Sequence, residues 1–166
     1  MAPRPFEVAI VGPGEAPARL LGLARELGRG LAARGARVWT GGLGGVMSAA
    51  LAGARAAGGA TVGVLPGASV RESPPNPHVE TPVYTGLGQG RNLILVLSVD
   101  VVVAVGGSWG TLSEVALARR HGRPVVLLES WTIDRAAAGS DPGCRVAASP
   151  EEAVRLAAEL RKDVET

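Results

Sequence analysis

The sequence predicts an α/β protein built on a doubly wound parallel sheet, with helices on both faces and three layers in all. Short runs rich in β-branched residues alternate along the chain with longer amphipathic runs, which is typical of parallel strands joined by helices. Glycine makes up 24 of the 166 residues and gathers in turns that follow predicted strands. The length suits one domain, and neither an internal repeat nor a linker divides the chain, so a single domain is expected over residues 1–166.

The first half of the chain alternates three predicted strands with two predicted helices. Strands are expected over residues 6–11, 37–40 and 60–65, which are short and rich in β-branched residues. Helices are expected over residues 16–33 and 45–57, which are longer and rich in alanine and leucine. Gly35 and Gly58 stand where helix-ending glycines belong, so each helix is expected to stop there.

The second half repeats this alternation. Helices are expected over residues 89–97, 111–120 and 150–162, and strands over residues 100–105, 124–128 and 145–147. The last helix has clear start signals, because Ser149 can cap it, Pro150 fits its first turn, and Glu152 completes an S-x-x-E capping box.

Residues 66–90 interrupt the pattern. Five prolines and several glycines exclude a long regular element there. Two interpretations remain open: a lid over a substrate, or a surface excursion with a short strand around Val83 and Tyr84.

The composition argues against several kinds of chemistry. A single cysteine, Cys144, excludes an internal disulfide and Cys-x-x-Cys redox chemistry, and two histidines are too few for a multi-histidine metal centre. The one lysine, Lys162, lies near the C-terminus, where a Schiff base with pyridoxal phosphate has no plausible site. We therefore expect neither a metal nor a cofactor.

Charge and hydropathy argue against nucleic-acid and membrane partners. The net charge is +2, the 17 basic residues are scattered among 15 acidic ones, and 3% aromatic residues offer few stacking surfaces. The longest apolar stretch, residues 93–105, is broken by Ser98 and Asp100, well short of the ~18 uninterrupted residues of a membrane span. The N-terminal apolar run is too short for a signal peptide, so the protein is expected to be cytoplasmic.

Two glycine-rich turns follow the first two strands. Gly12-Pro13-Gly14 begins like a dinucleotide fingerprint, but Pro17 replaces its third glycine, so an ordinary turn near a phosphate is the stronger interpretation. The second turn has four glycines in five positions and leads directly into a helix: Gly41, Gly42, Gly44 and Gly45, followed by Met47. Free N–H groups and the helix dipole favour an anion there, although a simple tight turn remains the alternative.

The third turn, residues 106–111, allows several interpretations. Gly106 to Gly110 match the G-x-S-x-G nucleophile elbow, but the hydrolase triad needs a later histidine, and none follows His121. A structural alternative is that Thr111 caps the helix and Glu114 completes a T-x-x-E capping box. Phosphate binding is the third.

Arg91 lies in the first turn of a predicted helix, where a cation meets the positive end of the helix dipole. An anionic ligand would account for this placement, as would a carboxylate such as Glu114 or a structural salt bridge. Both residues are expected at the edge of the sheet where open α/β proteins bind ligands.

These residues resemble the LONELY GUY (LOG) family, also called lysine-decarboxylase-like, whose signatures are G-G-G-x-x-G-L-M-G and P-G-G-x-G-T-x-x-E. Residues 40–48 match the first signature except at Thr40, Val46 and Ser48. Residues 106–114 match the second, with Gly106 for proline and Ser108 for glycine. The resemblance covers about residues 6–130.

The resemblance implies a Rossmann-like homodimer that hydrolyses the N-glycosidic bond of a nucleoside 5′-monophosphate such as AMP, giving free base and ribose 5-phosphate. Arg91 and Glu114 look like the family's catalytic pair, and Asp100 falls in register with an aspartate of the family. The expected phosphate- and ligand-binding residues lie in the three turns: Gly12, Gly41, Gly42, Gly44, Gly45, Met47, Gly106, Gly107, Ser108, Trp109, Gly110 and Thr111. The lack of a suitable lysine argues against decarboxylation.

A second function stays open. The family's Arg-Lys pair is Arg91-Asn92 here, and with the two changes in the second signature this looks like a sister branch that includes molybdenum-cofactor carrier proteins. The alternative is therefore a non-catalytic protein that binds a phosphorylated ligand. In either case a homodimer is expected, because residues 93–97 are consecutively apolar and one sheet can bury only one side of that helix.

Overall fold

The structure is a computed structural model that describes residues 4–133 and 141–164. Its strands are β1 (Phe6–Val11), β2 (Ala36–Thr40), β3 (Thr61–Leu65), β4 (Thr81–Tyr84), β5 (Val101–Val105), β6 (Val125–Leu128) and β7 (Cys144–Ala147). Its helices are α1 (Ala18–Ala33), α2 (Val46–Ala56), the 3₁₀ turn η1 (Gly88–Gly90), α3 (Arg91–Leu97), α4 (Trp109–Arg120) and α6 (Pro150–Val164).

The seven strands form one parallel sheet in the order β4-β3-β2-β1-β5-β6-β7. The order reverses between β1 and β5, so the connections run outward from this point in both directions. Such a switch point opens a crevice at the carboxyl ends of the two strands, where α/β proteins bind ligands. The predicted doubly wound fold is confirmed.

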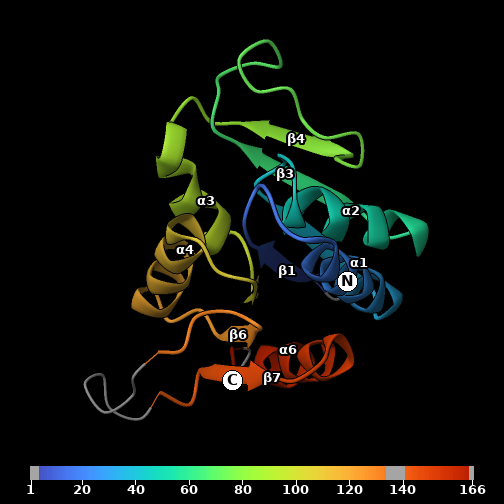
Figure 1. Cartoon of the computed structure of the whole chain (residues 1–166). Helices are drawn as coiled ribbons and strands as arrows, with labels where there is room; N and C mark the ends of the chain where they lie inside the picture. The colour runs from blue at the N-terminus through green and yellow to red at the C-terminus, as the bar shows by residue number, and fades with distance from the viewer. Residues whose placement is uncertain (1–3, 134–140, 165–166) are drawn as a thin grey trace.

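Helices cover both faces of the sheet, giving three layers (Figure 1). Alternate residues of each strand serve the two layers: Val8 and Ile10 of β1 pack with α1, α2 and α6, whereas Ala9 and Val11 pack with α3 and α4. Because both faces are covered, β1, β3, β5 and β6 are buried along their whole length, as parallel strands usually are.

Glycines bring α1 and α2 into backbone contact. A Cβ on Gly28 would lie 2.0 Å from the carbonyl oxygen of Ala50, and a Cβ on Gly53 would lie 1.9 Å from that of Arg25. Neither position has room for a methyl group, so the helix-weakening glycines are required by close packing. This contact fixes α2, whose first residue borders the second glycine turn.

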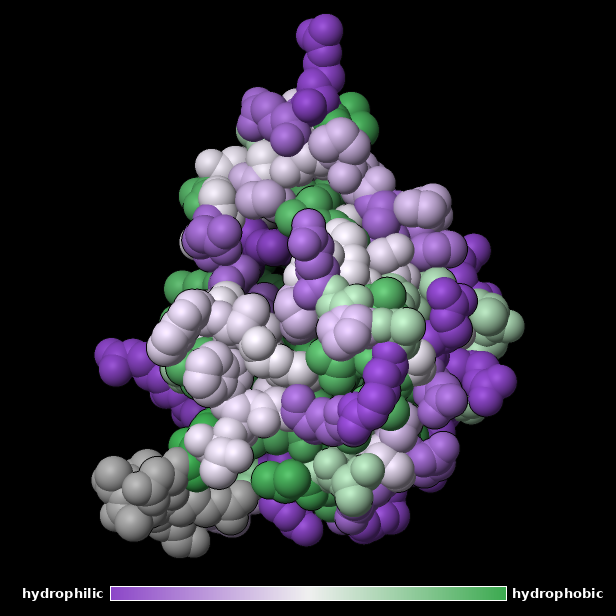
Figure 2. All heavy atoms as spheres, viewed as in Figure 1, coloured by the Kyte–Doolittle hydropathy of each residue, from purple (hydrophilic) through white to green (hydrophobic). Residues whose placement is uncertain are grey.

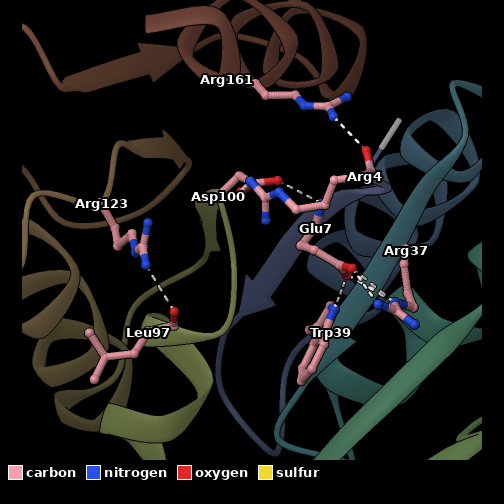
Figure 3. A network of polar contacts seen from close by, with 8 residues as sticks. All are labelled: Arg4, Glu7, Arg37, Trp39, Leu97, Asp100, Arg123 and Arg161. Atoms are coloured by element: carbon pink, nitrogen blue, oxygen red, sulfur yellow. Dashed lines mark hydrogen bonds and ion pairs between the residues drawn. The ribbon is translucent and has the colours of Figure 1, made fainter. Parts of the chain in front are cut away.

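A buried polar network ties the amino ends of β1, β2 and β5 together (Figure 3). Asp100 accepts hydrogen bonds from the backbone N–H of Glu7, at 2.9 Å, and from the Arg4 guanidinium. The Glu7 carboxylate accepts from Nε of Arg37, at 2.9 Å, and from the indole of Trp39. Each buried carboxylate therefore has the partners that its burial requires.

The boundaries differ from the predictions by one or two residues at several helix starts. The helix predicted from residue 89 begins as η1 and becomes α3 only at Arg91. Gly35 and Gly58 adopt φ of +78° and +74° and end their helices as predicted. The predicted Ser149 cap of α6 is also present, because Ser149 Oγ accepts from Glu152 N at 3.2 Å. The Glu152 carboxylate reaches one residue further back than in a capping box and accepts from Ala148 N at 2.8 Å.

The excursion over residues 66–90 contains a short strand, as one of the two interpretations proposed. β4 pairs with β3 at the edge of the sheet, where Pro82 needs no partner for its missing N–H. No helix in the described part of the chain is long and apolar enough to cross a membrane.

Candidate functional site

The three glycine turns meet at the carboxyl edge of the sheet, and the first two are packed against each other. The backbone N–H of Val46 donates to the carbonyl of Pro13 at 3.1 Å. A Cβ on Gly45, which has φ of +60°, would lie 2.4 Å from the same carbonyl oxygen. Gly12 is confined as well, because a Cβ added at this position would lie 2.5 Å from the Val105 carbonyl oxygen. These glycines thus serve close chain packing.

Some of the backbone N–H groups of the second turn already donate to other parts of the protein, so only the rest are available to a ligand. Gly42 N donates to Thr40 Oγ1 at 3.0 Å, and Val46 N is taken by Pro13. The N–H groups of Leu43, Gly44 and Gly45 have no acceptor among the described residues, and none of the three residues is buried. The expected anion cradle over residues 42–46 is therefore narrower than its glycine content suggests. Met47 is buried in α2.

At the third turn, the structural alternative in which Thr111 caps the helix is wrong. The cap is Ser108, which has extended backbone angles and whose Oγ accepts from Thr111 N at 3.2 Å. Thr111 lies inside α4, two residues after the helix begins at Trp109, so Thr111 and Glu114 do not form a capping box. Ser108 satisfies the helix end instead, because a hydroxyl three residues before an N–H can reach it.

Four consecutive N–H groups at this turn remain open. Those of Gly107, Ser108, Trp109 and Gly110 have no acceptor among the described residues. Gly107, Trp109 and Gly110 are exposed, so these donors are accessible at the positive end of α4. This is the part of the site best suited to hold an anionic group.

Arg91 is buried and fastens the ends of two strands. Its Nη1 donates to the carbonyls of Gly41 and Val64, both at 2.6 Å. A Cβ on Gly41 would lie 2.1 Å from this Nη1, so any larger residue at this position would displace the guanidinium. The two carbonyls explain how a cation is tolerated at the start of a helix. The Nε of Arg91 is buried without a partner.

Glu114 is the second buried charged residue of the site. Only 8% of it is exposed, and it has no hydrogen-bond or ion-pair partner in the described part of the chain. Burial raises the pKa of its carboxyl to about 7, although the positive charge of Arg91 opposes this rise. Burial also lowers the pKa of Arg91, and here the charge of Glu114 opposes the change.

Arg91 and Glu114 therefore lie near each other at one end of the sheet and interact through their charges. They form no salt bridge, which was one of the possible explanations for the position of Arg91. A carboxyl with a pKa near 7 exists in both protonation states at neutral pH, which suits proton transfer or stabilisation of a developing cation. Asp100 lies at the opposite, amino end of the sheet and has a structural role (Figure 3).

Asn76 is a site-forming residue that the sequence reasoning missed. Its backbone N–H donates to the carbonyl of Gly42 at 2.9 Å, and its side-chain Nδ2 donates to the carbonyl of Leu43 at 2.8 Å. The excursion over residues 66–90 is thus fastened to the second glycine turn. A lone asparagine among prolines was the available signal, since Asn side chains often bond to backbone in loops.

Trp131 was missed as well. Its Nε1 donates to the carbonyl of Ser108 at 3.1 Å, which holds the third turn from outside. No local pattern around residue 131 reveals a contact to a turn so far away in the sequence.

The viewed face of the molecule mixes hydrophilic and apolar residues (Figure 2). Figure 2 shows strongly hydrophilic residues scattered over the viewed face among apolar and weakly polar ones, without a continuous strip.

The comparisons with known proteins agree with this fold. The SLOG cluster4 family matches residues 5–154. The molybdenum cofactor binding protein from the phototrophic bacterium Rippkaea orientalis is 39% identical, with a TM-score of 0.86 over 99% of this chain and 100% of that one. The molybdenum cofactor carrier protein of Chlamydomonas reinhardtii is 38% identical, with a TM-score of 0.85 over 95% of this chain and 98% of that one.

An enzyme is also similar to this chain. The cytokinin riboside 5′-monophosphate phosphoribohydrolase of Mycobacterium tuberculosis is 34% identical over 121 residues, which are 69% of this chain and 65% of that enzyme. The similar proteins thus include both carriers and a hydrolase.

Proposed function

The chain belongs to the SLOG cluster4 family, part of the LOG and lysine-decarboxylase-like superfamily, and from this premise we propose that it hydrolyses the N-glycosidic bond of a nucleoside 5′-monophosphate. The products are the free base and ribose 5-phosphate. The observation that carries the proposal is Glu114, a buried carboxyl without a hydrogen-bond partner in the described chain and with a pKa of about 7.

The reaction has a use for such a group. When a glycosidic bond to a base breaks, its electron pair leaves with the base and positive charge develops on the ribose ring. Ionised Glu114 stabilises this charge, or orients the water whose oxygen forms the new bond to C1′. The proton released by the water is balanced by the proton that the departing base takes up.

The other residues of the site hold the substrate. The open N–H groups of Gly107 to Gly110, with those of Leu43 to Gly45, are placed to donate to the 5′-phosphate. Arg91 already donates to two carbonyls, so it acts mainly through its charge and by holding Gly41 in place. Its Nη2 donates to no described residue and its buried Nε has no partner either, so both remain as donors for a ligand.

The second candidate is a carrier for a phosphorylated ligand such as the molybdenum cofactor. It is favoured by the 39% identity to the Rippkaea orientalis protein along nearly the whole of both chains. A carrier needs the N–H groups and Arg91 but has no step for Glu114 to perform.

Incubation with AMP and with isopentenyl-AMP separates the two candidates. We expect release of free base and ribose 5-phosphate by the natural protein, and its loss in Glu114→Gln, which keeps the shape of the side chain but cannot ionise. We also expect kcat/KM to fall below pH about 7, where Glu114 becomes protonated. Tight binding of AMP without release, or normal release by the glutamine variant, would contradict the hydrolase.

A further inference from the structure

Trp109 is the most conspicuous exposed side chain near the site. It is the first residue of α4, and 78% of it is exposed. Tryptophan has a large apolar face and usually finds a contact for it, which is why it is enriched where proteins bind something else. The position of Trp109 within the run of open N–H groups makes a ligand the natural contact.

The ring of Trp109 packs at an angle against a second tryptophan. The two ring centroids of Trp109 and Trp131 lie 5.2 Å apart, with 39° between the ring planes. Trp131 is itself fixed, because its Nε1 donates to the carbonyl of Ser108 at 3.1 Å. A Cβ on Gly107 would lie 3.1 Å from that Nε1, so the turn is closely packed against the indole. One face of Trp109 is thereby supported, while most of the residue stays open.

A second feature indicates that a ligand belongs here. Glu114, in the second turn of the same helix, is more than nine-tenths buried and has no polar partner among the described residues. The Nε of Arg91, whose charge acts on Glu114, is itself buried without a partner. Buried polar atoms normally have partners, so this pair of residues indicates that a further molecule completes the site.

We propose that Trp109 is the surface on which a planar heteroaromatic ring of the phosphorylated ligand stacks, with Trp131 supporting it from behind. The inference rests on the proposed function, because it takes the phosphate to be held by the N–H groups of residues 107–110. Both a nucleobase and a pterin have such a ring. Stacking on an indole recognises the flat π-face and tolerates differences at the ring edge.

The test compares ligands that share the phosphate but differ in the ring. Binding of AMP, ribose 5-phosphate and neopterin monophosphate is measured by calorimetry, in a Glu114→Gln background so that AMP is not consumed. Trp109→Ala is compared with Trp109→Phe. The control is Val146→Ala, which removes another exposed apolar side chain: Val146 lies on β7 and is 66% exposed.

We expect Trp109→Ala to weaken AMP binding by about tenfold or more, while ribose 5-phosphate binds unchanged. Trp109→Phe should retain most of the affinity for AMP, and Val146→Ala should bind all three ligands normally. A selective loss of neopterin monophosphate in a protein that does not bind AMP would support the stacking and refute the hydrolase.

Two outcomes would overturn the inference alone. One is unchanged AMP affinity in Trp109→Ala, and the other is an equal loss of AMP and ribose 5-phosphate, since a damaged turn affects both. A change in sedimentation of Trp109→Ala together with such an equal loss would assign the indole to a subunit contact. Failure of the unaltered tryptophan protein to bind any of the three phosphates would remove both the inference and the proposed function.

Discussion

Glu114→Gln should stabilise the protein, and the gain should depend on pH. The pKa of Glu114 rises from 4.5 to about 7 on folding, because burial disfavours the ionised form. A folded state that holds its proton more tightly than the unfolded chain is most stable when the group is protonated. This contribution is fully present below pH about 4.5 and is lost as the pH rises through about 7.

The size of the effect follows from the same shift. One pKa unit corresponds to about 1.4 kcal/mol, so ionisation of Glu114 lowers the free energy of unfolding by about 3 kcal/mol at pH 8. Glutamine has the same shape and cannot ionise. We therefore expect the variant to be close to the natural protein at pH 4.5 and more stable by about 3 kcal/mol at pH 8.

Urea unfolding at a series of pH values measures this difference directly. Glu7→Gln is the matched control, because Glu7 is equally buried but is paired with Arg37 and Trp39. Its loss should destabilise the protein, the opposite sign to Glu114→Gln. A stability difference between natural protein and Glu114→Gln that does not change with pH would refute the assigned burial and pKa of this carboxyl.

Three further predictions address the phosphate, the glycine turn and the assembly. AMP should raise the melting temperature and adenosine should not, because the open N–H groups need an anion; equal shifts would count against the cradle. Gly41→Ala should lower the free energy of unfolding by about 1–3 kcal/mol, because the new methyl group displaces Arg91 from its two carbonyls. Gly22→Ala is the control: a Cβ at this position in α1 would meet no atom within 4 Å, so chemical denaturation should show neutral or slightly raised stability. Leu93 and Leu97 are 36% and 42% exposed on α3, so we expect sedimentation equilibrium at micromolar protein to show a dimer; a single species of 16.8 kDa would contradict it.

The order of strands and helices could be predicted because residues close together in the sequence indicate where each element begins and ends. β5 consists of four valines and one alanine between Asp100 and Gly106. The start of α6 is fixed by Ser149 and Glu152, which lie three residues apart. The short strand β4 was predictable only as an alternative, because Pro82 and the surrounding glycines are typical of irregular chain as well as of an edge strand.

The partners of the site residues could not be predicted, because they come from distant segments. Arg91 bonds to carbonyls 50 and 27 residues earlier in the chain, and backbone carbonyls leave no mark in a sequence. The glycines of the second turn looked like a generous phosphate cradle, yet Gly41 makes room for Arg91 and Gly45 makes room for Pro13. A glycine signals a close approach without saying whether chain or ligand approaches.

The charge of Glu114 bears on the choice between carrier and hydrolase. Ionised above pH about 7, it repels the phosphate of any ligand and also lowers the stability of the fold. Glutamine would serve a carrier better on both counts, since it removes the repulsion at the same shape. A step in which positive charge develops beside the carboxylate offsets these two costs. For a hydrolase we therefore expect Glu114→Gln to bind AMP more tightly while it stops releasing base. For a carrier the same substitution would tighten binding and change nothing else, so affinity and base release measured on one variant decide between them.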